Sequence, residues 1–158
     1  RMPKPIFREN NLVDIIQENI NLLKELDNSI DISFNNNFDK ILLKSDKEQI
    51  SRVFLNLIKN SIESINQRAQ NNNNFSKKIT IELSEDDNHI RSTIEDNGVG
   101  FNELKDNIKN ILNPYFTTKK NGTGLGLSIV NKIINDHNGK IDFIPIKNGA
   151  KINIMFSK

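Results

Sequence analysis

The sequence predicts one α+β domain, built as a two-layer sandwich of helices and mostly antiparallel strands. Three observations lead to this fold class. Apolar residues recur at helical spacing in long segments, apolar and polar residues alternate in several short segments, and helices and strands come in blocks. The length of 158 residues suits about one domain.

The first ten residues predict an extended linker, because Pro3 and Pro5 break any incoming helix. We therefore expect the domain to occupy residues 11–158 and the chain to be a piece of a longer protein. A first helix is predicted over residues 11–26. Its apolar residues at helical spacing are Leu12, Ile15, Ile16, Ile20, Leu23 and Leu26.

Two short strands, at 30–34 and 41–44, precede a second helix. Asp46 is the expected N-cap of that helix, Gln49 takes the capping-box position, and the helix should reach about Arg68.

The second half of the chain adds strands, a hairpin and a third long helix. We expect strands at 78–84 and 89–95, a short helix at 103–111, a helix from near Gly124 to near His137, and strands at 141–146 and 151–156. Gly139 stops the last helix, and Asn148-Gly149 forms the turn of the closing hairpin.

Composition excludes several classes of protein. The formal net charge is +2, and no dense basic segment marks a nucleic-acid surface. The chain has no cysteine, which excludes disulfide frameworks and thiolate metal sites. No apolar run approaches the roughly 20 residues that a membrane-spanning helix needs.

A polar stripe follows one side of the otherwise apolar second helix: Gln49, Asn56, Asn60 and Glu63, spaced by 7, 4 and 3 residues. Polar groups on a buried helix need partners. The stripe indicates either a wet, charged pocket, in which Asn60 could offer its carbonyl oxygen to Mg²⁺, or else a solvated face or helix–strand hydrogen bonding. The helix alone leaves both interpretations open.

Asp96 ends a predicted strand and is followed by Gly98 and Gly100. A carboxylate beside closely approachable backbone suits recognition of a base through its exocyclic amine. The motif by itself favours an ordinary turn, because Asp-Asn-Gly is a strong turn signal.

Three glycines at alternate positions, Gly122, Gly124 and Gly126, lead into the third long helix. Bare backbone amides at a helix N-terminus favour phosphate. The preceding segment adds Lys119 and Lys120, which could neutralise phosphate charge. It also contains Phe116, which could anchor a lid; the alternative is a solvated loop with one packed aromatic ring.

The only histidines are His89, near a strand start, and His137, in the last turn of a helix. Neither has an acid or nucleophile partner at a recognisable spacing, so we expect structural roles for both.

In this order and spacing, the motifs resemble those of the catalytic and ATP-binding domain of sensor histidine kinases, in the superfamily that includes DNA gyrase B. Residues 56–61 resemble the N box, 96–100 the G1 box, 114–118 the F box, and 122–126 the G2 box. Tyr115 stands where the F box commonly has phenylalanine. The match covers roughly residue 12 to the C-terminus. Glu63, the Thr-Thr-Lys of the F box and the opening Arg-Met-Pro-Lys-Pro-Ile-Phe look closest to nitrogen-regulation-type sensor kinases.

The resemblance implies a Bergerat fold, in which helices cover one face of a mixed, mainly antiparallel sheet, with ATP and Mg²⁺ as cofactors. It implies that Asp96 binds the adenine amine, that Asn60 holds Mg²⁺, and that Asn56 lies near the phosphates. Asn56 and Asn60 are the expected catalytic residues. The residues expected to contact ATP are Asn56, Asn60, Glu63, Asp96, Gly98, Gly100, Phe116, Thr117, Lys119, Gly122, Thr123, Gly124, Leu125 and Gly126.

One position separates the branches of the superfamily. The related ATP-hydrolysing members of the superfamily carry a water-activating glutamate four residues before the asparagine that holds the metal. This chain, which resembles them, has Asn56 at that position. An amide takes no proton at neutral pH, so we expect ATP binding to outrun hydrolysis and to leave the γ-phosphate for a protein acceptor.

The resemblance places the acceptor histidine on a separate helical dimerisation domain of the parent protein, before this segment. Neither His89 nor His137 matches its motif. We therefore expect a histidine kinase domain that binds ATP, does not phosphorylate itself, and acts indirectly on a response regulator.

The resemblance also implies a cytoplasmic domain without nucleic-acid or direct membrane contact. The parent protein could be anchored by a segment in the inner membrane. The alternatives are a serine/threonine kinase of the anti-sigma type and a non-catalytic ATP-binding switch.

Overall fold

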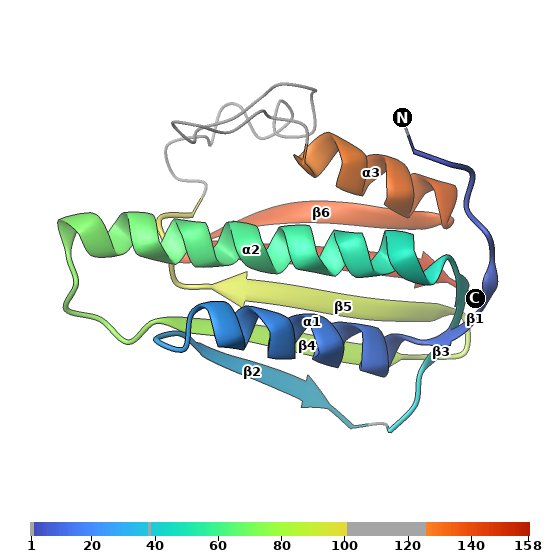
Figure 1. Ribbon diagram of the computed structural model, residues 1–158, viewed down its shortest axis with the longest axis horizontal. Coiled ribbons are helices and arrows are strands. Elements are labelled where there is room, and N and C mark those ends of the chain that lie inside the picture. Colours follow the sequence, from blue (N-terminus) through green and yellow to red (C-terminus); the bar gives the residue numbers. More distant parts are fainter. Residues whose placement is uncertain (1, 38, 101–125) are drawn as a thin grey trace.

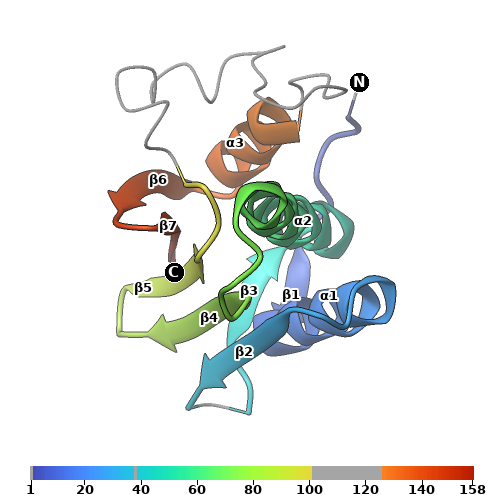
Figure 2. The same ribbon diagram turned by 90° about the vertical axis from the view of Figure 1, so that its left-hand side faces the viewer.

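The computed structural model describes residues 2–37, 39–100 and 126–158, and it confirms the α+β two-layer sandwich. One five-stranded sheet carries the described helices on a single face (Figures 1 and 2). The strand order in this sheet is β2-β4-β5-β7-β6.

The sheet is mixed but mainly antiparallel. Only β2 runs parallel to its neighbour β4, while β4, β5, β7 and β6 pair antiparallel. The strands are β2 (Asp31–Asn36), β4 (Lys78–Glu85), β5 (His89–Asp96), β6 (Gly139–Ile146) and β7 (Gly149–Ser157). Alternate residues of β4, β5 and β7 are buried, which is why these segments read as strands with one apolar face.

The helices are α1 (Leu12–Leu26), α2 (Lys47–Asn71) and α3 (Gly126–Asp136). The long α2 lies between α1 and α3 and packs on β4 and β5 (Figure 2). Its Phe54, Leu57 and Ile58 are fully buried and form the centre of the core. The predicted N-cap is confirmed, since the Asp46 carboxylate accepts from the Gln49 N–H at 3.1 Å.

A separate two-stranded ribbon joins the start of the chain to α2. Here β1 (Arg8–Asn11) pairs antiparallel with β3 (Leu42–Ser45). Residues 8–10, which the sequence predicts as part of an extended linker, thus belong to a strand that is hydrogen-bonded to β3. The Asn11 side chain then caps α1 by accepting from the Val13 N–H at 3.1 Å.

One helix end differs from the sequence prediction. The second helix continues past Arg68 to Asn71, and the N–H of Asn72 bonds the Arg68 carbonyl at 3.0 Å. These last residues continue no apolar stripe, but Ala69 and Gln70 are good helix formers. The third helix begins at Gly126 in the described part of the chain. The predicted helix at 103–111 lies outside the described residues.

Candidate functional site

Asp96 ends β5 with its carboxylate buried against α2; the residue is 5% exposed. Its Oδ1 accepts from the Gly98 N–H at 2.9 Å. The Ser61 hydroxyl on α2 and the Ala150 backbone of β7 also hydrogen-bond to it. Burial raises the pKa of Asp96 to about 6, although these three donors favour the charged form. The result is a desolvated carboxylate at a strand end, as recognition of an amine donor requires.

The loop after Asp96 is packed tightly onto α2. The Val99 N–H bonds the Ser64 carbonyl at 3.3 Å, and the Gly100 N–H bonds the Ser64 hydroxyl at 3.4 Å. A Cβ on Gly98 would lie 2.3 Å from the Ser64 hydroxyl oxygen and 2.5 Å from its carbonyl carbon. Gly98 is therefore required by packing, and it brings bare backbone against the helix.

The closing hairpin supports the same loop from the other side. Gly149 has φ 155°, and a Cβ there would lie 1.9 Å from the Asp96 carbonyl oxygen. Gly100 has φ 69°, and a Cβ there would lie 2.1 Å from the Gly149 carbonyl oxygen. Two glycines that are far apart in the sequence thus meet at the edge of the Asp96 loop.

The structure places Asn56, Asn60 and Glu63 along α2, all half-buried, on the helix that contacts Asp96. Since Ser61 hydrogen-bonds to Asp96, the predicted asparagine helix and the predicted base-binding carboxylate come together.

The fourth member of the polar stripe lies elsewhere. Gln49 is buried near the start of α2, and its Nε2 donates to the Pro3 carbonyl at 3.1 Å. At 1.5 Å per residue, Gln49 lies about 16 Å along the helix from Asn60. Gln49 therefore contacts the N-terminal segment, and the polar stripe of α2 is not one continuous surface.

Gly126 is the only predicted glycine-loop residue within the described ranges. It is exposed and is the first residue of α3 in the described part of the chain. The other expected ATP contacts of that region lie outside the described residues: Phe116, Thr117, Lys119, Gly122, Thr123, Gly124 and Leu125.

The sequence analysis missed Ser61, Ser64 and Gly149 as neighbours of this site. Ser61 and Ser64 are small residues on the buried helix that accommodate the loop, and only the fold brings them to Asp96. Gly149 was identified as a hairpin turn residue, but nothing in the sequence indicated that this hairpin supports Asp96.

Both histidines have structural contacts. His137 follows α3 and is 5% exposed; its Nδ1 lies 2.7 Å from the Ile133 carbonyl oxygen, and its Nε2 accepts from the Asp46 N–H. His89 is the first residue of β5, and its ring lies 3.7 Å from the Asp86 carboxylate. The expected structural roles agree with these contacts.

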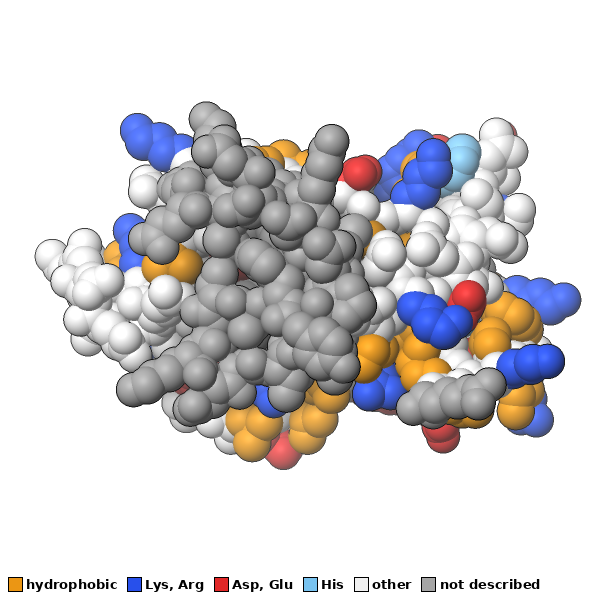
Figure 3. All heavy atoms as spheres, turned by 90° about the horizontal axis from the view of Figure 1, so that it is seen from above, with side chains coloured by type: hydrophobic (Ala, Val, Ile, Leu, Met, Phe, Trp, Pro, Cys, Tyr) orange, Lys and Arg blue, Asp and Glu red, His pale blue; other side chains and the backbone are white. Residues whose placement is uncertain are grey.

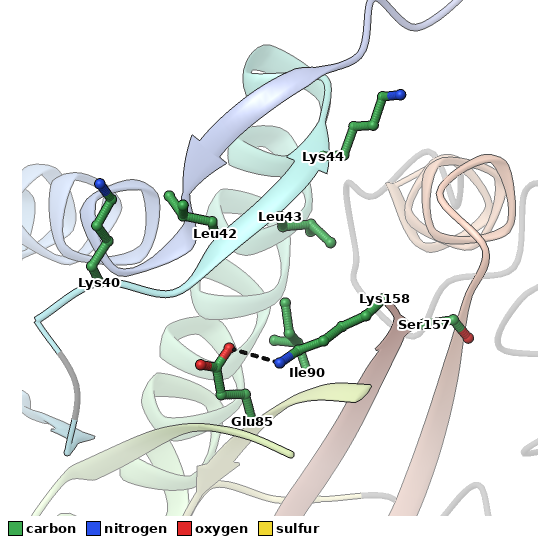
Figure 4. Close-up of a pocket in the computed structure, with 8 residues that line it drawn as sticks. All are labelled: Lys40, Leu42, Leu43, Lys44, Glu85, Ile90, Ser157 and Lys158. Carbon is green, nitrogen blue, oxygen red and sulfur yellow. Dashed lines mark ion pairs between the residues drawn. The ribbon is translucent and has the colours of Figure 1, made fainter. Parts of the chain in front are cut away.

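A recess of about 510 Å³ lies at the opposite end of the sheet from Asp96 (Figure 4). Leu42, Leu43 and Ile90 form its apolar wall, and an ion pair between Lys158 and Glu85, 3.2 Å long, closes one side. Glu85 ends β4 and Ile90 begins β5, whereas Asp96 ends β5. This recess is therefore separate from the Asp96 site.

On the face shown in Figure 3, lysine and arginine side chains lie at separate places among neutral ones.

Among residues 2–37, 39–100 and 126–158 no helix is long and apolar enough to cross a membrane. Within the same ranges, no group of three or more His, Cys, Asp or Glu side chains could hold a metal ion by itself.

Comparison with known proteins identifies the family of this site. Residues 45–157 match the family described as histidine kinase-, DNA gyrase B-, and HSP90-like ATPases. The chain is 36% identical over 159 residues to a putative NtrY-like sensor histidine kinase of Rickettsia bellii, covering 99% of this chain. It is 35% identical over 134 residues to the sensor histidine kinase ZraS of Salmonella typhi, covering 83% of this chain. The chain spans only 25% and 27% of the length of these two relatives.

Solved structures show the same fold. The nucleotide-free catalytic domain of histidine kinase ThkA superposes with a TM-score of 0.82 at 32% identity, covering 97% of this chain and 96% of that chain. ThkA in complex with the response regulator TrrA superposes with a TM-score of 0.78 at 28% identity, covering 98% of this chain and 42% of that chain. The predicted likeness to nitrogen-regulation-type sensor kinases is confirmed by the NtrY-like relatives.

Proposed function

The chain belongs to the family of histidine kinase-, DNA gyrase B-, and HSP90-like ATPases, as a catalytic domain of the sensor histidine kinase type, and we propose that it binds Mg-ATP. We propose further that the domain donates the γ-phosphoryl group to a histidine on a separate helical domain of the same parent protein. The parent acts in a two-component system and passes the phosphoryl group on to a response regulator.

The observation that carries this proposal is the environment of Asp96. Asp96 is 5% exposed, and its carboxylate, with Oδ1 held by the Gly98 N–H, lies against α2 next to Asn60. An oxygen acceptor in a desolvated pocket discriminates strongly for a ligand with a matching N–H donor. The exocyclic amine of adenine is such a donor.

Asn60 is the proposed Mg²⁺ ligand, and the chemistry of the site fits this ion. Mg²⁺ prefers oxygen ligands, keeps several waters and commonly takes the rest of its shell from substrate phosphates. The Asn60 amide oxygen and the Glu63 carboxylate are hard donors on the helix beside Asp96. When bound, the ion would neutralise charge on the phosphates.

Asn56 favours transfer over hydrolysis. It is half-buried on α2, one turn before Asn60, where a general base for water would have to stand. An amide has no proton-accepting function at neutral pH. Phosphoryl transfer depends mainly on positioning and charge stabilisation, so the domain can hold ATP until its protein nucleophile arrives.

The acceptor is expected outside this chain. His137 is buried and bonded to two backbone groups, and His89 lies beside Asp86, so neither presents a free imidazole to Asp96. The relatives are about four times as long as the chain, which leaves room for the helical domain. The complex of ThkA with its response regulator supports the same kind of partner for the parent of this chain. We place the domain in the cytoplasm, with the parent anchored in the inner membrane.

Calorimetry with ATP and Mg²⁺ tests the binding step. The unmodified chain should bind ATP, and Asp96→Asn should bind at least about tenfold more weakly, because the acceptor pairing with adenine is lost. Glu95→Gln is the matched control, since Glu95 is the exposed neighbour of Asp96 in β5. The absence of binding by the unmodified chain at millimolar ATP would contradict the proposal.

Labelled ATP tests the transfer step. The chain alone should remain unlabelled, and a longer parent that includes the helical domain should become labelled on histidine. Labelling of the isolated chain on serine or threonine would instead support a serine/threonine kinase.

A further inference from the structure

Arg68 lies in the last turn of α2 and reaches the loop that follows Asp96. Its Nη1 donates to the Asn97 carbonyl oxygen at 2.6 Å. The guanidinium carbon lies 3.9 Å from the centroid of the Phe75 ring, in the segment that follows α2. The arginine is thus fixed by a cation–π contact on one side and directed at one backbone carbonyl on the other.

That carbonyl belongs to the same peptide unit as the Gly98 N–H. The Gly98 N–H donates to Oδ1 of Asp96 at 2.9 Å, while the Asn97 C=O accepts from Arg68. A peptide unit is rigid and planar, so fixing the direction of its C=O also fixes the direction of its N–H. Arg68 therefore acts on the Asp96 carboxylate through one peptide plane.

The other hydrogen bonds of Asn97 are made by groups outside this peptide unit. The Asn97 side chain accepts from the Lys78 N–H at 3.0 Å and donates to the Ser76 carbonyl at 2.5 Å, which ties the residue to the start of β4. These bonds, with that of the Asn97 N–H to the Lys78 carbonyl at 3.3 Å, hold the Asn97 side chain and the peptide before it. The Asn97–Gly98 peptide itself is held at its carbonyl by Arg68, at its N–H by Asp96, and beside Gly98 by the close packing on Ser64. A charged donor makes a stronger hydrogen bond than a neutral one, so the arginine dominates at the carbonyl end.

We propose that Arg68 is a positioning residue of the nucleotide site, which aligns the Asp96 carboxylate for the adenine amine through the Asn97–Gly98 peptide. Phe75 holds the guanidinium in place. The inference rests on the proposed function, because it assigns Asp96 to adenine. It adds a specificity role for a residue that does not touch the nucleotide.

The variant Arg68→Gln tests this role through base selectivity. Guanine has a carbonyl oxygen where adenine has its amine, so a well-aligned Asp96 favours ATP over GTP. We expect Arg68→Gln to bind ATP about tenfold more weakly, with GTP affinity unchanged, so that the ATP:GTP preference falls by the same factor. Arg52→Gln is the matched control, since Arg52 is an exposed arginine on the same helix; it should leave both affinities unchanged.

Two further variants distinguish positioning from a merely structural role. Arg68→Lys keeps a charged donor and should recover part of the ATP:GTP preference. Phe75→Leu keeps an apolar side chain but removes the aromatic ring. It should lower the ATP:GTP preference although Arg68 itself is unchanged. A structural role would lower the free energy of unfolding but leave the ATP:GTP ratio of the folded protein unchanged.

The results separate this inference from the proposed function. No ATP binding by the unmodified chain removes the proposed function and the inference with it. Binding by the unmodified chain, with an unchanged ATP:GTP ratio in Arg68→Gln and Phe75→Leu, overturns the inference alone. Circular dichroism reports which variants fold; if Arg68→Gln does not, an unchanged ratio in Arg68→Lys and Phe75→Leu overturns it.

Discussion

The imidazole of His137 accepts a hydrogen bond from the backbone N–H of Asp46, with 3.0 Å between Nε2 and N. The contact joins the end of α3 to the N-cap of α2, across 91 residues of sequence. On its other side the ring lies 2.7 Å from the Ile133 carbonyl oxygen, through Nδ1, and the Phe7 ring packs against it edge-on at 5.0 Å. The hydrogen bonds at the two ring nitrogens require the tautomer with the proton on Nδ1.

Replacing His137 should therefore affect stability and not nucleotide binding. His137→Ala leaves the Asp46 N–H without its acceptor and opens a cavity beside Phe7, so we expect the free energy of unfolding to fall by about 2–4 kcal/mol. Urea unfolding followed by circular dichroism measures this change. ATP affinity of the folded variant should stay within about twofold.

The control for this variant is His89→Ala. His89 is at the start of β5 and is partly exposed, so its loss should cost less than about 0.5 kcal/mol. A large loss of ATP affinity in folded His137→Ala would contradict the structural role of His137.

Asp96 predicts a pH dependence of stability that opposes the usual acid denaturation. Its pKa is raised from 3.8 to about 6 in the folded chain, so between these values the folded state binds more protons than the unfolded state. The contribution of Asp96 is thus fully present below pH 3.8 and is lost as the pH rises through 6. At about 1.4 kcal/mol per pKa unit, the loss is about 3 kcal/mol.

The measurement is the difference in unfolding free energy between Asp96→Asn and the unmodified chain from pH 4 to pH 8. The difference removes the contributions of other carboxyls, such as Asp27. Hydrogen bonds from Ser29 lower the pKa of Asp27. The variant should gain relative stability up to about pH 6.5 and then level off. A flat difference would mean that the buried carboxylate is not penalised by desolvation.

The same titration should appear in base selectivity. The ionised Asp96 accepts from the adenine amine, and its protonation below pH 6 removes an acceptor, so ATP affinity should fall up to about tenfold per pH unit there. GTP carries the same phosphates, so the ATP:GTP affinity ratio cancels their titration. A ratio that is constant from pH 5 to pH 8 would argue against Asp96 as the adenine ligand.

The layout of the fold was predictable because its segments carry clear periodicity. The apolar spacing of α1, the Asp46 cap of α2 and the Asn148-Gly149 turn each identify an element from neighbouring residues alone. The pairing of β1 with β3 was not predictable, since residues 8–11 have no alternating pattern and their partner lies more than thirty residues away.

The same limit applies to the site. Asp96 and Asn60 are recognisable because their motifs are local and follow in a known order. Arg68 and Ser64 are not, because each acts on the Asp96 loop through a backbone group, and any sequence can present a backbone carbonyl or N–H there. Gln49 shows the opposite error, since it shares a helical stripe with Asn60 but bonds Pro3 at the far end of α2.

A buried hydroxyl in β5 predicts a stabilising substitution. Ser92 is 1% exposed, and its Oγ has no hydrogen-bond partner in the described part of the chain. Ser92→Ala removes an unpaired polar atom from the core, so the free energy of unfolding should rise by about 1 kcal/mol. Ser45→Ala is the matched control, since Ser45 is equally buried but donates to the Leu43 carbonyl at 2.9 Å; it should destabilise. Equal effects of the two variants would show that hydrogen bonding of the serine hydroxyl does not decide the sign of the change in unfolding free energy.

Two glycines of the proposed site should respond differently to the same substitution. A Cβ on Gly98 meets Ser64 at 2.3 Å, whereas a Cβ on Gly126 meets no atom of the described residues within 4 Å. Gly98→Ala should therefore lower the free energy of unfolding by about 2 kcal/mol or more. Gly126→Ala, at the start of α3, should keep or slightly raise it, because alanine restricts the unfolded chain.

ATP binding then tests what Gly126 contributes. If its bare backbone approaches the phosphates, Gly126→Ala should weaken ATP binding while the fold stays intact. Calorimetry beside thermal unfolding separates the two effects in one pair of variants. Unchanged ATP affinity in Gly126→Ala would remove this residue from the phosphate contacts, and a stable, ATP-binding Gly98→Ala would contradict the close packing of the Asp96 loop on α2.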